Sequence, residues 1–166
     1  MTYSVAMSRT WPSDWEQRVA GVDCAMCASS GQEDNGYGLR ILDGAFVDAY
    51  LQRKTPQPGY AVAIWKHGHV VELDDLDDPA LAGYTIEVAR VGGAIQRRFR
   101  AAKMNYLTLG NALPHLHTHV QARFLDDPAP GSPLRWEHIS TAAMLPEERF
   151  VQQVHELRHL IGHPPR

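Results

Sequence analysis

Two short histidine-rich stretches could carry chemistry, and the first is PHLHTHVQARF, which contains His115, His117 and His119. On a β-strand, residues two positions apart point to the same face, and a rise of about 3.3 Å per residue puts the outer two imidazoles about 13 Å apart. A histidine–zinc bond measures only about 2.0–2.1 Å, so one metal ion does not easily take all three. The spacing therefore favours divided roles, one histidine structural, one reactive and one supporting. The alternative is the solvated polar face of an edge strand.

The second stretch, HELRH, places His155 and His159 one helical turn apart, with Glu156 next to the first. This is the H-E-x-x-H pattern, in which two histidines bind zinc and the glutamate acts as the general base of a metalloprotease. Such enzymes generally need a third ligand further along the chain, and only seven residues follow His159. We expect an ordinary packed helix here and keep the zinc protease as an alternative.

The two cysteines, Cys24 and Cys27, form a single C-x-x-C pair. This spacing is typical of zinc ligands, and a closed tetrahedral site would need two histidines because no further cysteine is present. In a chain without a secretory signal the pair indicates a cytosolic metal or redox site, not a disulfide framework. A reduced pair that binds no metal is the alternative.

The bulk composition is that of one globular domain with a sizeable core: 166 residues, 44% hydrophobic and 21% charged. A formal charge of −3 gives no sign of a general nucleic-acid binder. No apolar run approaches the length of a membrane span. The first residues lack a basic start followed by an apolar stretch, so we expect no secretory signal and a cytoplasmic protein.

The elements that must position these side chains form an α+β fold with an antiparallel sheet. The apolar stretch YAVAIW predicts a central strand, and NYLTLGN and HLHTHVQARF predict two further strands. Between them we predict a long helix from Pro79 to about Lys103, with Asp78 as its N-cap and Pro79 at the first helical position. A final amphipathic helix, PEERFVQQVHELRHLIG, carries its apolar stripe on Phe150, Val154, Leu157 and Ile161.

The stretch HLHTHVQ resembles the signature of the histidine triad family, His-x-His-x-His followed by mostly apolar residues. The resemblance extends to QRKTPQPGYAVAIWKHGH, to LGNALPHLHTHVQARF and to the C-x-x-C, and so covers about residues 24–125. It implies a single domain over residues 1–166, with a core at about 24–125 and a C-terminal extension at 126–166. Thr118 and Gln121 stand where the family usually has apolar side chains, so we expect the back face of this strand to be more polar or more exposed.

The family resemblance implies nucleotidyl chemistry on the triad strand. The middle histidine, here His117, would attack the α-phosphorus of a nucleotide and form a nucleotidyl-histidine intermediate. The backbone carbonyl of His115 would fix the tautomer of the attacking ring, and His119 would face the phosphate or the leaving group. A neutral imidazole suits this role because its unperturbed pKa is about 6.5. Substrate contacts are expected from three amide side chains: Asn111, Asn105 and Gln52.

The zinc-containing branch of the family implies a structural zinc held by Cys24, Cys27, His69 and His115. His67 competes with His69, because both share a strand face and spacing does not separate them. The expected partners are a small nucleotide substrate and a second copy of the chain in a homodimer, with no nucleic acid and no membrane. The resemblance implies a hydrolase or transferase, and the alternative is a nucleotide-binding regulatory module with little turnover.

Overall fold

The computed structural model describes residues 10–127, 129–133 and 142–162. It is a mixed α/β fold built on an antiparallel sheet, as the sequence predicts. The strands are β1 Gly38–Asp43, β2 Val47–Gln52, β3 Tyr60–Trp65, β4 Lys103–Leu109 and β5 His117–Arg123. The helices are α1 Trp15–Val19, α2 Ala25–Ala28, the 3₁₀ helix η1 Leu73–Asp75, α3 Asp78–Phe99 and α5 Glu147–Gly162. No helix in the described part of the chain is long and apolar enough to cross a membrane.

The five strands lie in the order β1-β2-β3-β5-β4, and each pairs with its neighbours in antiparallel fashion. The stretch YAVAIW is therefore the central strand, as predicted, and β5 lies between β3 and β4. In this register Ile64 and Leu109 flank His117, while Val62 and Leu107 flank His119. The triad strand is thus paired on both sides, which excludes the solvated edge strand that the sequence left open.

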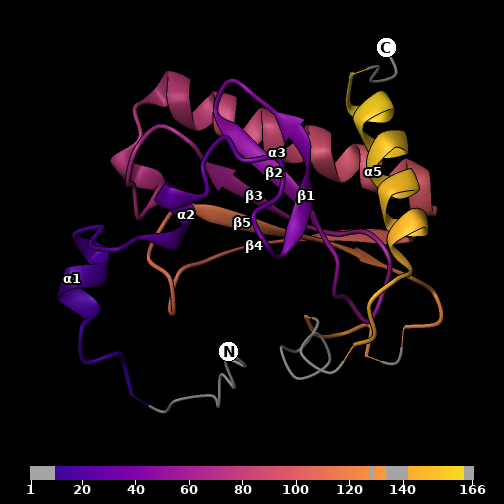
Figure 1. The fold of residues 1–166 in the computed structure, drawn as a ribbon, viewed down its shortest axis with the longest axis horizontal. Helices are drawn as coiled ribbons and strands as arrows, with labels where there is room; N and C mark the ends of the chain where they lie inside the picture. Colours follow the sequence, from indigo (N-terminus) through magenta and orange to yellow (C-terminus); the bar gives the residue numbers. More distant parts are fainter. Residues whose placement is uncertain (1–9, 128, 134–141, 163–166) are drawn as a thin grey trace.

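One face of the sheet carries the main hydrophobic core. Alternate residues of β2, β3 and β5 point towards α3, which lies across the sheet in Figure 1, and α5 stands at the right of the same view. The predicted stripe of α5 is confirmed, because Phe150, Val154, Leu157 and Ile161 are all buried in this core. The side chains that alternate with the core residues, including His117 and His119, point to the opposite face.

The ends of α3 differ from the prediction. The N-cap is Asp77, not Asp78, because the Asp77 carboxylate accepts the backbone N–H of Ala80 at 2.9 Å. The helix ends at Phe99 and not near Lys103, since Arg100 adopts a left-handed conformation with φ 55° and ψ 43°. That residue stops the helix, and Lys103 already belongs to β4. Because the helix stops early, the chain turns at Arg100 and enters β4, which pairs with β5.

Of the two alternatives expected from Thr118 and Gln121, a more polar or a more exposed strand, exposure is wrong, since both side chains are buried. Thr118 points to the α3 side, where its hydroxyl lies 2.8 Å from the Tyr84 hydroxyl and 2.8 Å from that of Thr108. Gln121 lies on the other face, which it shares with His117 and His119 by alternation. The polar residues of the strand are therefore accommodated inside the protein, and the hydroxyl of Thr118 is satisfied there by other hydroxyls.

Candidate active site and metal centre

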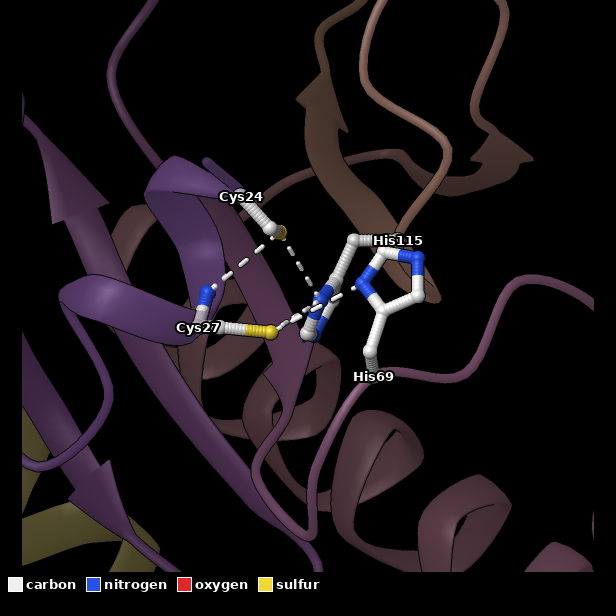
Figure 2. Close-up of side chains that lie close together, drawn as sticks. All are labelled: Cys24, Cys27, His69 and His115. Carbon is white, nitrogen blue, oxygen red and sulfur yellow. Dashed lines mark hydrogen bonds between the residues drawn. The ribbon is translucent and has the colours of Figure 1, made fainter. Parts of the chain in front are cut away.

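Four predicted ligands come together from three separate segments. Cys24 precedes α2 and Cys27 lies within it, His69 follows β3, and His115 immediately precedes β5. Their four candidate ligand atoms all lie within 4.8 Å of one another. Figure 2 shows the two sulfur atoms directed towards the two imidazole rings. This cluster could bind a metal ion.

The tautomers of the two histidines suit metal binding. His115 Nε2 lies 2.9 Å from the carbonyl oxygen of Trp65, and His69 Nε2 lies 3.1 Å from that of Val19. A carbonyl oxygen only accepts hydrogen bonds, so each Nε2 carries the proton and each Nδ1 carries a lone pair. Metal-bound histidines usually donate their second N–H in this way, which fixes the orientation of the ring. Both Nδ1 atoms face the cysteine sulfurs.

Three contacts within the cluster have the lengths expected around a tetrahedral zinc ion. His115 Nδ1 lies 3.4 Å from each sulfur, and His69 Nδ1 lies 3.7 Å from Cys27 Sγ. Bonds of about 2.3 Å to sulfur and about 2.0–2.1 Å to nitrogen put tetrahedral ligand atoms about 3.3–3.8 Å apart. Burial and the neighbouring Cys24 thiol raise the pKa of the Cys27 thiol to about 11. The Cys27 thiol therefore stays protonated near neutral pH unless a bound cation stabilises its thiolate.

His67, the competitor for the fourth position, lies outside this cluster. Its Nε2 contacts the carbonyl oxygen of Ala45 at 2.5 Å, and its ring packs edge-on against Phe46 and Trp65. The strand ends at Trp65, and Gly68 turns the chain with φ +80°. The two histidines therefore do not share a strand face, and His69 alone is directed towards the cysteines.

The backbone of His115 fixes the tautomer of a neutral His117 ring. Its Nδ1 lies 2.6 Å from the carbonyl oxygen of His115, which can only accept, so Nδ1 carries the proton and Nε2 carries the lone pair. The side chain is 5% exposed, and burial lowers its pKa below the ordinary value. An unprotonated Nε2 is the atom that could attack an electrophile such as phosphorus.

His119 lies beside His117 on the same face, with ring centroids 4.9 Å apart and planes at 73°. Its Nδ1 lies 2.7 Å from the hydroxyl of Tyr60, on the neighbouring strand β3. Burial, followed by the nearby His117, lowers the pKa of His119 to about 4. Both histidines are therefore neutral at pH 7, and His119 is ordered by the Tyr60 phenol.

Comparison with known families identifies the chain. The model of the HIT domain, the histidine triad domain, matches residues 40–125, more than half of the 166 residues. The chain belongs to the histidine triad family. No curated protein matches it.

Solved histidine triad proteins share the fold. The structure of a histidine triad protein from Bradyrhizobium japonicum is 25% identical with a TM-score of 0.68, and the match covers 75% of this chain and 91% of that one. A histidine triad protein from Marinobacter aquaeolei is 20% identical with a TM-score of 0.68, covering 78% and 92%. A zinc-bound histidine triad family protein from Mycobacterium smegmatis is 21% identical with a TM-score of 0.58, covering 85% and 92%.

The three predicted substrate-binding amides are not gathered at one point of this histidine triad fold. Asn105 lies on β4 opposite Gln121, and its Oδ1 accepts a hydrogen bond from Arg123 at 2.7 Å. Asn111 is exposed in the turn that follows β4. Gln52 ends β2 and donates to the carbonyl of Tyr50 at 3.3 Å. By strand alternation Asn105 and Gln52 share the sheet face of His117 and His119, whereas Asn111 lies beyond the end of β4.

The HELRH stretch does not form a metal site among the described residues. Glu156 forms an ion pair with Arg98 of α3, and its other oxygen accepts from Gln152 at 3.1 Å. His155 and His159 lie exposed on α5, outside the one group of potential ligands found in the described part of the chain. The glutamate that a protease would use as its base is instead part of the contact between two helices.

Sequence analysis missed Tyr60, which contacts a triad histidine directly. The residue begins β3 and is placed opposite Gln121 by the register of β3 and β5. Strand alternation puts Tyr60, Val62 and Ile64 on one face, and the pairing of two predicted neighbouring strands would have brought that face beside the histidines. The alternation of residues along the strand therefore indicated the face of Tyr60, but its contact with His119 follows only when the register between the strands is known.

Proposed function

We propose that the protein is a nucleotidyl hydrolase or transferase that works through a nucleotidyl-histidine intermediate on His117. The observation that carries this proposal is the 2.6 Å contact between His117 Nδ1 and the His115 carbonyl, which leaves a lone pair on Nε2 of a buried neutral ring. An activated nucleophile of this kind splits a difficult displacement into two easier ones. The family membership supports a nucleotide substrate, and we propose one with a reactive α-phosphate.

In the first step the Nε2 lone pair of His117 forms a bond to the α-phosphorus. The bond from phosphorus to the leaving oxygen or nitrogen breaks, and its electron pair departs with the leaving group. In the second step water or another acceptor attacks the same phosphorus and gives up its proton to solvent, and the phosphorus–nitrogen electron pair returns to His117. The proton stays on Nδ1 of His117, hydrogen-bonded to the His115 carbonyl, throughout, so the ring begins and ends each cycle in the same tautomer.

The amide side chains are proposed as substrate contacts around this centre. Asn105 uses its oxygen for Arg123, so its amide nitrogen stays available as a donor to a phosphate oxygen. Asn111 lies just beyond Leu109, the residue that flanks His117. Gln52 lies on β2, two strands and about 10 Å from β5, where a ribose could lie if the nucleotide crosses the sheet.

Zinc is the proposed occupant of the Cys24, Cys27, His69 and His115 cluster. Two thiolates and two imidazoles are a donor set that zinc favours in closed structural sites. All four positions are filled by protein, so none remains for substrate. The ion would tie α2 to the start of β5 and thereby hold His115, whose carbonyl in turn orients His117.

The proposal is tested by incubating the protein with a dinucleoside polyphosphate, a nucleoside phosphoramidate, an adenylyl sulfate and a sugar nucleotide in parallel. We expect a mass increase of one nucleotidyl group per chain after an alkaline denaturing quench, and product release in step with its decay. The class with the highest kcat/KM identifies the substrate. Tight nucleotide binding without adduct or product in all four would instead support the regulatory module.

We also propose that two copies of the chain form a homodimer through β4 and the adjoining part of α3. β4 is an edge strand with no strand partner on its outer side among the described residues, and its Tyr106 and Leu109 are 47% and 53% exposed. The Tyr106 hydroxyl lies against Gly92 of α3, where an added Cβ would come within 2.1 Å of it. Tyr106 thus joins strand and helix in one partly apolar surface on the α3 side, while Leu109 lies at the end of the same edge strand on the histidine face.

Light scattering at micromolar concentration should give the mass of a dimer. Leu109→Lys, which places a charge on the exposed edge, should shift the equilibrium towards monomer, because charged side chains oppose edge-to-edge pairing. The exposed Val22 lies outside this surface, so Val22→Lys serves as the matched control and should remain dimeric. A monomeric wild-type protein would exclude the dimer.

A further inference from the structure

Tyr60 and His119 form a close pair on neighbouring strands. The hydroxyl oxygen lies 2.7 Å from His119 Nδ1, and the two rings stack at 21° with centroids 5.9 Å apart. Tyr60 is only 4% exposed, and its ring packs with Tyr50, Val62 and Ile64 on the histidine face of the sheet. The pair is therefore fixed by packing as well as by the hydrogen bond.

The direction of this hydrogen bond follows from burial. A buried phenolic O–H needs an acceptor, and among the described residues the hydroxyl of Tyr60 has one hydrogen-bond partner, His119 Nδ1. The hydroxyl therefore donates to Nδ1, and the proton of the neutral imidazole lies on Nε2. His117 has the opposite arrangement, with its proton on Nδ1 and its lone pair on Nε2.

We propose that Tyr60 is a positioning residue that keeps His119 in the Nε2–H tautomer, so that this N–H donates a hydrogen bond to the leaving group while His117 attacks. The inference rests on the proposed nucleotidyl transfer. The two adjacent histidines thus have complementary tasks, set by two different partners: a backbone carbonyl makes one ring a nucleophile, and a phenol makes the other a donor.

The His119 N–H would assist the first step by stabilising charge on the leaving group. As the bond from phosphorus to the leaving atom breaks, negative charge develops on that atom, and a hydrogen bond from Nε2–H stabilises it. Leaving groups of high pKa develop the least stable charge and so depend most on the donor. With a pKa near 4, His119 is neutral at pH 7, so its tautomer, not its charge, decides whether it can donate. Burial also raises the pKa of Tyr60, which keeps the phenol protonated.

The test compares Tyr60→Phe with Tyr84→Phe over a series of substrates that share one nucleotidyl group and differ only in the pKa of the leaving group. Each variant loses one buried hydroxyl and keeps the ring, but the Tyr84 hydroxyl contacts Thr118 on the α3 side of the sheet. We expect Tyr60→Phe to lower kcat/KM by about 10–100-fold for the poorest leaving group and by less than about 3-fold for the best. Tyr84→Phe should lower stability without changing the dependence on the leaving group.

A double-mutant cycle separates positioning from a purely structural effect. If Tyr60 acts through His119, Tyr60→Phe should cause no further loss in a His119→Ala background, because coupled residues are not additive. Equal losses for all leaving groups, or full additivity with His119→Ala, would overturn the inference. A wild-type protein that turns over none of the series would overturn the proposed function itself, which is a different result.

A measurement on the wild-type protein keeps the test independent of folding and activity of the variants. Nitrogen-15 NMR of the histidine rings at pH 7 distinguishes a protonated from an unprotonated ring nitrogen. The inference requires a pyrrole-like Nε2 for His119 and a pyrrole-like Nδ1 for His117. A proton on Nδ1 of His119 would overturn it.

Discussion

His117→Ala protein should fold, keep its metal and form no covalent nucleotidyl adduct. The side chain lies outside the metal cluster and outside the main core, so its removal leaves the elements that hold the site in place. Loss of a covalent nucleophile leaves only binding and electrostatic stabilisation, and the rate should fall by on the order of three or more powers of ten. Intact mass after an alkaline quench measures the adduct, and steady-state turnover of the best of the four substrate classes measures the rate.

The matched control for this variant is His155→Ala, which removes an exposed imidazole from α5. We expect near-normal adduct formation from it, and likewise from Glu156→Gln, although the latter weakens the contact with Arg98. Near-normal turnover by His117→Ala combined with inactivity of these two variants would move the active site to α5 and contradict the proposed function.

Cys24→Ser should lose zinc and much of its thermal stability. The serine hydroxyl replaces a soft thiolate with a poor ligand, and ligand loss weakens a site whose binding energy contributes directly to folding. A loss of about 3 kcal/mol corresponds to a drop in melting temperature of roughly 10 °C for a chain of this length. Metal content by atomic emission and melting by circular dichroism are the two measurements.

A pair of histidine variants sharpens the metal prediction. His69→Ala should reproduce the zinc loss of Cys24→Ser, whereas His67→Ala, two positions away, should retain zinc because its ring faces Ala45, Phe46 and Trp65. Unchanged zinc content in both Cys24→Ser and His69→Ala would remove the proposed site. The reverse outcome for the two histidines would assign the fourth ligand to His67.

The strands, the long helix and the terminal helix were predictable because each has a strong periodic pattern. Three-to-four spacing of apolar residues marks α3 and α5, and β-prone apolar runs mark the central strands. The ends were less predictable. Four aspartates surround the start of α3, and composition does not tell which of them accepts the Ala80 N–H; the backbone geometry selects Asp77. The end of the helix depends on the turn at Arg100, which the periodic pattern does not encode.

The ligands and triad residues were visible as residue types, but their contacts depend on the folded chain. Spacing alone left His67 and His69 equivalent, and only the turn at Gly68 separates them. Tyr60 carried no motif at all, since a lone tyrosine at the start of a strand is an ordinary core residue. Its contact with His119 arises from the register between β3 and β5, two strands separated by the whole of α3 in the chain.

His115 belongs to two sites at once. Its ring faces the two cysteine sulfurs, and its main-chain oxygen holds the ring of His117. Metal and nucleotide would then be linked ligands: if zinc strengthens the binding of a nucleotide by some factor, the nucleotide strengthens the binding of zinc by the same factor. Titrating zinc with and without a bound nucleotide measures the coupling free energy between the two sites directly. Under metal limitation, copies of the protein engaged with nucleotide would be the last to lose their ion.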